Sequence, residues 1–149
     1  MIGLAPYGLT GAEIAVQQQE ATLKSLQTAP AQVAAAVKRQ QAMFEIIRQT
    51  PDNAQAQAIV ANMLRQSNPS LDETTAQTSA AEMVTDRYRY YLSFNPAEEL
   101  PKITCPVLLL YGSADSVLNP DNNLAPLTRS LKANKAVTVR KLAGVNHFV

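Results

Sequence analysis

The chain has 149 residues, which is enough for one domain with a buried core. Its composition, 46% hydrophobic and 17% charged, is ordinary for a globular protein, and a net charge of +1 gives no reason to expect a nucleic-acid partner. The single cysteine, Cys105, excludes an intrachain disulfide and a cysteine-rich zinc site. No apolar run approaches the roughly 20 residues that span a bilayer, so we expect no membrane partner.

The first two-thirds of the chain have the pattern of α-helices separated by proline. Four helices are predicted, over about residues 10–27, 31–49, 56–67 and 70–84. Thr10 with Glu13 fits a capping box, and Ser70 with Glu73 fits a second one. The third helix has apolar residues at i, i+3, i+4, i+7 and i+8, which is the pattern of one buried stripe. We expect these helices to pack together or to cover another part of the protein.

From Pro101 onward the pattern becomes that of an α/β protein. Residues 105–111 (CPVLLLY) form a continuous apolar run, which is typical of a strand buried on both faces of a parallel sheet. A helix is predicted over about residues 120–134, and residues 136–142 alternate as a second strand. Strand, helix and strand together predict a βαβ unit with parallel strands, and therefore an α/β fold class.

Two residues of this unit are candidates for catalysis. Asp115 follows the first strand and His147 follows the second, and parallel neighbouring strands bring both loops to the same edge of the sheet. An aspartate that binds one ring nitrogen of a histidine fixes its tautomer and leaves the other nitrogen to act as a base. Taken singly, Asp115 is also compatible with a turn former and His147 with a solvated side chain.

Other residues with reactive or aromatic side chains are better explained by structure. Cys105 begins the predicted strand, so we interpret it as a structural free cysteine and not as a nucleophile. Ser113 and Ser116 flank the candidate acid and are expected to form hydrogen bonds within its turn. Three tyrosines are interpreted as packing residues and not as a stacking surface for nucleic acid: Tyr88, Tyr90 and Tyr91.

Two segments resemble the α/β-hydrolase superfamily, most closely its serine esterase and peptidase-like branch. Residues 105–115 (CPVLLLYGSAD) resemble the "PVLxxxGxxD" segment that carries the triad acid. Residues 144–148 (GVNHF) resemble the "GxNH" segment that carries the triad histidine. Family members order their triad Ser, Asp, His along the chain, and the last two occur here in that order.

The resemblance implies a division of the chain and a function for the intact protein. Residues 1–9 would be a remnant of a core strand and loop, residues 10–94 a helical cap, and residues 95–149 the last βαβ unit of the hydrolase core. Asp115 would be the acid and His147 the base of a Ser-Asp-His triad that hydrolyses ester or amide bonds of a small acyl substrate. The resemblance implies no metal and no organic cofactor.

The triad serine is missing from the sequence. None of the eight serines lies in the Gly-x-Ser-x-Gly motif of the family, whose nucleophile would precede Met1. We therefore expect a C-terminal fragment of a hydrolase, inactive by itself, whose exposed sheet edge could permit self-association. The alternative is a non-catalytic helical interaction module that carries a small α/β appendage.

Overall fold

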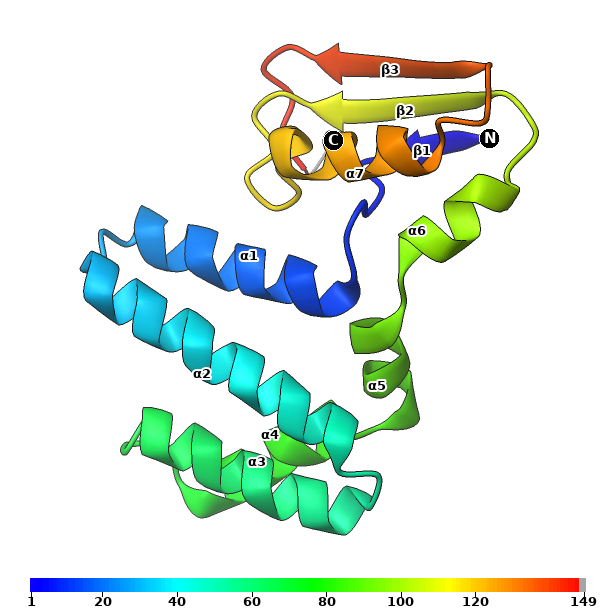
Figure 1. The fold of residues 1–149 in the computed structure, drawn as a ribbon. Coiled ribbons are helices and arrows are strands. Elements are labelled where there is room, and N and C mark those ends of the chain that lie inside the picture. Colours follow the sequence, from blue (N-terminus) through cyan, green and yellow to red (C-terminus); the bar gives the residue numbers. More distant parts are fainter. Residues whose placement is uncertain (148–149) are drawn as a thin grey trace.

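The computed structural model describes residues 1–147, which form seven α-helices and three parallel strands (Figure 1). The strands are β1 (Ile2–Leu4), β2 (Val107–Gly112) and β3 (Val137–Leu142). The helices are α1 (Gly11–Ser25), α2 (Pro30–Gln49), α3 (Asn53–Ser67), α4 (Glu73–Met83), α5 (Asp86–Ser93), α6 (Pro96–Glu99) and α7 (Pro120–Ser130), with a 3₁₀ turn at Leu100–Lys102. The predicted α/β class is confirmed. Phe148, the last residue of the segment that resembles "GxNH", lies outside the described residues.

The sheet has the order β1-β2-β3, and both pairs of neighbours are parallel. Val107 pairs with Val137 at one end of the β2–β3 register, and Gly112 pairs with Leu142 at the other. Helix α7 joins β2 to β3, as the predicted βαβ unit requires.

One face of the sheet is covered by α7. Because side chains alternate along a strand, Val107, Leu109 and Tyr111 of β2 share this face, and they pack with Leu127 and Leu131 in one buried cluster. The opposite face carries Leu108 and Leu110, and beside them Ile2 and Leu4 of β1, which are 66% and 75% exposed. Parallel sheets are normally covered on both faces. In residues 1–147 only one face of this sheet is covered.

The helices α2 to α5 enclose a second and larger cluster. Its buried members come from four helices and the turn that follows α4: Phe44, Ile47, Ala56, Val60, Ala61, Ala76, Ala80, Val84 and Leu92. The small alanine side chains allow α3 and α4 to lie close together. Tyr88 and Tyr91 pack against this cluster, as predicted, whereas Tyr90 is 66% exposed and contacts Phe94.

The helix starts follow from their capping residues, with one correction. The predicted box at Thr10 is present, with the hydroxyl and the Glu13 carboxylate each accepting from the other residue's backbone N–H. The predicted box at Ser70 is wrong. Asp72 is the N-cap of α4 and accepts from the N–H of Thr75 at 2.9 Å, while the Ser70 hydroxyl donates to the side chain of Asn68.

Two further predictions fail around the ends of β2 and α7. Helix α7 ends at Ser130 and not near Asn134, because the next backbone N–H groups, of Lys132 and Asn134, bond to carbonyls three residues back, as in turns. The Asn134 side-chain amide donates to the carbonyls of Ile103 and Cys105 in the loop before β2. Cys105 itself precedes β2 and is exposed, so its interpretation as part of a buried strand is wrong.

The helical part and the sheet are joined at two places (Figure 1). The segment between β1 and α1 leads into the helices, and α5 and α6 lead back to β2. The amide of Gln18 on α1 also donates to the carbonyl of Val117, in the loop that follows β2, at 3.4 Å. No helix among residues 1–147 combines the length and the apolar character needed to cross a membrane.

Candidate functional site

Asp115 and His147 lie together beyond the carboxyl ends of β2 and β3. His147 Nδ1 is 2.9 Å from Asp115 Oδ2. The Asp115 side chain is only 1% exposed, whereas the His147 side chain is 28% exposed. The pair that the sequence predicted is therefore within hydrogen-bond distance, with a buried carboxylate behind a partly accessible imidazole.

The loop after β2 fixes the Asp115 carboxylate through its other oxygen. Oδ1 accepts backbone N–H groups from Val117 at 2.9 Å and from Leu118 at 2.7 Å. These bonds orient the side chain, so that Oδ2 points toward the imidazole. The two oxygens thus have separate roles, since one closes the turn and the other holds His147.

The loop that carries His147 lies directly on the end of β2. The N–H of Ser113 donates to Leu142 O at 2.9 Å, and the N–H of Ala114 donates to Val145 O at 3.0 Å. Gly112 makes this close approach possible, because a Cβ at that position would lie 2.2 Å from Val145 O. The approach brings the two loops together, and with them the two candidate residues.

Ser113, one of the two serines beside Asp115, does not behave as predicted. The Ser113 hydroxyl accepts the N–H of Gly144 at 2.9 Å, so it links the two loops and does not close its own turn. Gly144 has a φ of 72°, a left-handed conformation that suits glycine. Ser116 lines a hollow of about 350 Å³ between this loop and α1, together with Gln18, Ala21, Thr22, Ser25 and Val117.

Tyr111 and Asn123 hold the segment that precedes α1 against the sheet. The Tyr111 hydroxyl donates to Pro6 O, and Asn123 Oδ1 accepts from the N–H of Gly8 at 3.0 Å. Burial, with a further contribution from the negative charge of Asp115, raises the pKa of Tyr111 far above its ordinary value. The hydroxyl therefore remains a neutral donor.

Neither Tyr111 nor Asn123 was predicted to have this role. The one sequence signal for Asn123 is its position four residues before the core residue Leu127, which places a polar side chain on the buried face of α7. Asn123 is 1% exposed, and its amide group donates to Asn119 O at 3.1 Å.

The chemistry that this arrangement supports is acid–base chemistry. When Nδ1 carries the proton and donates a hydrogen bond to the Asp115 carboxylate, the lone pair of the neutral imidazole is on Nε2. The carboxylate then stabilises the imidazolium that forms when Nε2 takes up a proton. Within residues 1–147, no group of three or more His, Cys, Asp and Glu side chains is arranged to hold a metal ion.

Comparison of the chain with protein-family models, with curated proteins and with solved structures finds no match. The resemblance to α/β-hydrolases therefore rests on the two sequence segments and remains a prediction.

Proposed function

We propose that Asp115 and His147 are the acid and the base of a serine-hydrolase triad of the α/β-hydrolase type. The observation that carries the proposal is the 2.9 Å contact between His147 Nδ1 and the buried carboxylate of Asp115, at adjacent ends of two parallel strands. Catalytic groups of open α/β sheets lie at this edge.

In the proposed reaction His147 acts through Nε2. It takes the proton of a serine hydroxyl as the serine oxygen attacks the carbonyl carbon of an ester or amide, and it returns the proton to the departing alcohol or amine. A water molecule then hydrolyses the acyl-enzyme by the same proton transfers in turn. Asp115 keeps the proton on Nδ1 and stabilises the imidazolium at each step.

We infer that the serine comes from sequence outside these 149 residues. The uncovered face of the sheet supports this inference, because Ile2 and Leu4 are exposed on the strand beside β2. In a larger parallel sheet, additional helices would cover such a face. The helices α1 to α5 would then form the cap, with α1 beside the loop that carries Asp115.

Labelling with a fluorophosphonate, which reacts with activated serines, tests the proposal. We expect no label on the 149-residue chain, and specific label on a longer expression product that includes the sequence encoded upstream of Met1. In the longer protein, His147→Ala should abolish labelling, because the serine then has no base. Asp115→Asn should reduce it strongly, because the imidazole then favours the wrong tautomer.

Control measurements separate catalysis from folding. Each variant should keep the circular dichroism spectrum of the unchanged protein, and Lys38→Ala, a change on the exposed surface of α2, should label normally. A folded, longer protein that is labelled equally with and without His147 would refute the proposal and favour a non-catalytic interaction module.

A further inference from the structure

A hollow larger than the one beside Ser116 lies within the helices and not at the Asp115–His147 pair. Helices α1 and α2 diverge from their connecting turn, and α5 lies across the open end of the wedge (Figure 1). The pocket between these three helices has a volume of about 640 Å³. This volume is within the range of small-molecule sites in proteins.

The inner wall of this pocket is apolar. Val16 of α1, Phe44 of α2 and Leu92 of α5 line it, so each of the three helices contributes an apolar side chain. Polar side chains stand nearer the mouth, among them the exposed Gln41 and Ser93. An apolar interior with a small number of polar groups is typical of ligand sites.

The charged side chains of the pocket already have partners within the protein. Arg48 donates to both carboxylate oxygens of Glu45, at 2.8 Å and 2.7 Å. The Arg89 guanidinium donates to the carbonyls of Ile47, Thr50 and Val84 and to the side chain of Asn53. Glu13 Oε2 accepts from the N–H and the hydroxyl of Thr10.

The charge balance of the lining and the internal bonds of Arg89 favour an uncharged ligand. The lining holds two arginines and two glutamates, so its formal charge is balanced. The Arg48–Glu45 pair is exposed, with side chains 71% and 43% accessible, and contributes little to this preference.

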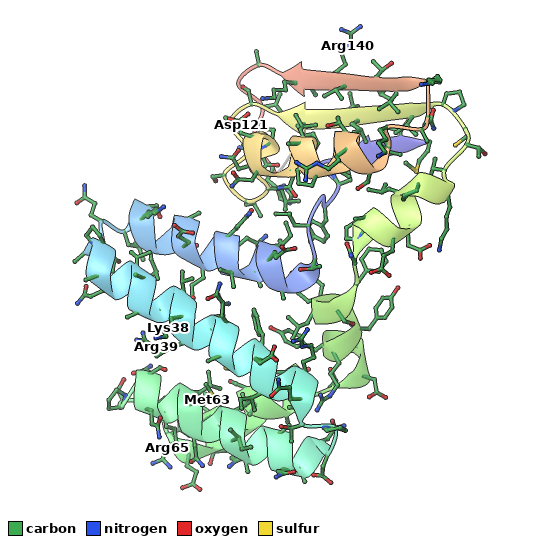
Figure 2. The ribbon with its side chains drawn as sticks, viewed as in Figure 1. Lys38, Arg39, Met63, Arg65, Asp121 and Arg140 are labelled. Atoms are coloured by element: carbon green, nitrogen blue, oxygen red, sulfur yellow. The ribbon has the colours of Figure 1, made fainter. Side chains whose placement is uncertain are left out.

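A charged ligand that engaged the partly buried Arg89 would have to displace its bonds to the carbonyls of Ile47 and Thr50, which is costly. Basic side chains that could attract an anion, Lys38 and Arg39, are elsewhere on α2 and do not line the pocket (Figure 2).

The pocket is separate from the candidate catalytic site. The α1 residues that line it are Ala12, Glu13, Val16 and Gln17. The α1 residues that face the Asp115 loop are Gln18, Ala21, Thr22 and Ser25. With 3.6 residues per turn the two sets lie on opposite faces of α1, so a ligand in the wedge has the helix between itself and the loop.

We propose that the wedge between α1, α2 and α5 is a binding site for an uncharged, apolar small molecule. This inference does not depend on the proposed hydrolase function. The ligand lies against Val16, Phe44 and Leu92 and directs any hydrogen-bonding group toward Gln17 and Gln41, which also line the pocket.

Titration of the full chain with N-phenyl-1-naphthylamine, an uncharged apolar dye that fluoresces in apolar sites, tests the proposal. We expect saturable binding at one site, and methyl NMR shifts at Val16 and Leu92 but not at Leu108 and Leu110 of the uncovered sheet face. Shifts confined to Leu108 and Leu110, or no saturable binding, would overturn it.

Two substitutions that fill the pocket, one on α2 and one on α5, and one control substitution outside it test the location of the site. Gln41→Trp and Ser93→Trp each place a large side chain at an exposed lining position and should raise the dissociation constant for the dye at least about tenfold. Ala42→Trp is the control, because Ala42 is exposed on the same helix and does not line the pocket. Equal affinity in all three variants would refute the proposal.

Discussion

The helical part and the sheet differ in how completely they are packed. The helices enclose their own apolar cluster, with Ile47, Ala56 and Val60 fully buried at its centre. The sheet has a core on one face only, and large apolar side chains are exposed on the other. The candidate catalytic pair nevertheless belongs to the less completely packed part. The comparison shows that the ends of two parallel strands can position a pair of side chains without a core on both faces of the sheet.

Truncating one aliphatic side chain in each part should give the largest difference in the free energy of unfolding. Ile47→Ala removes a side chain that is 0% exposed and leaves a cavity, which should lower the free energy of unfolding by about 2–5 kcal/mol. Leu4→Ala, in the sheet, removes one that is 75% exposed and should change it by less than about 0.5 kcal/mol. Urea unfolding followed by circular dichroism measures both. Equal losses would contradict the contrast.

Gly112→Ala should disturb the catalytic loops while leaving the helices intact. The added Cβ would meet Val145 O, so the loop carrying His147 must move, at a cost of about 1–3 kcal/mol in unfolding free energy. We expect NMR shifts at His147 and Asp115 and none at Ile47. Gly144→Ala is the control, because a Cβ there has no atom within 4 Å and meets only the strain of a positive φ. A larger loss for Gly144→Ala would contradict this assignment.

Tyr111→Phe should have a smaller effect that depends on pH. The change removes the hydrogen bond to Pro6 O, and should lower the free energy of unfolding by about 1 kcal/mol near neutral pH. Because the pKa of Tyr111 is raised in the folded state, the unfolded chain releases this proton first as the pH rises. The stability due to the neutral hydroxyl is fully present below the unfolded pKa and falls above pH 10 or so.

Unfolding measurements across this alkaline range compare the two proteins. As the pH rises, the free energy of unfolding should fall more steeply for the unchanged protein than for Tyr111→Phe. Tyr88 and Tyr91, whose pKa values are also raised by burial, contribute to both curves and cancel in the difference. Parallel curves would show that Tyr111 is not a source of the pH dependence.

The sequence predicted the features that depend on local patterns. The capping box at Thr10, the parallel βαβ unit and the meeting of Asp115 with His147 all follow from residues close in the chain or from strand topology. Competition among neighbouring polar groups was not predictable in the same way. Thus Asp72 caps α4 in place of Ser70, and Ser113 bonds to the neighbouring loop.

Contacts between distant segments were the least accessible to prediction. Asn123 reaches Gly8 across 115 residues, and Tyr111 reaches Pro6 across 105. The wedge-shaped pocket depends on the angle between α1 and α2, which narrow apolar stripes do not specify. The direction of individual surface side chains is a further detail of this kind. Arg140, for example, projects from β3 away from the helices (Figure 2).

The tautomer of His147 tests the central claim most directly. It is the only histidine, so its ring nitrogens are identified without ambiguity in a ¹⁵N NMR spectrum recorded where the imidazole is neutral. We expect the proton on Nδ1 in the unchanged protein, because it donates to the Asp115 carboxylate, and a shift of the proton to Nε2 in Asp115→Asn. A proton on Nε2 in the unchanged protein, or a tautomer that Asp115→Asn does not alter, would contradict the assignment of Asp115 and His147 as an acid and base pair.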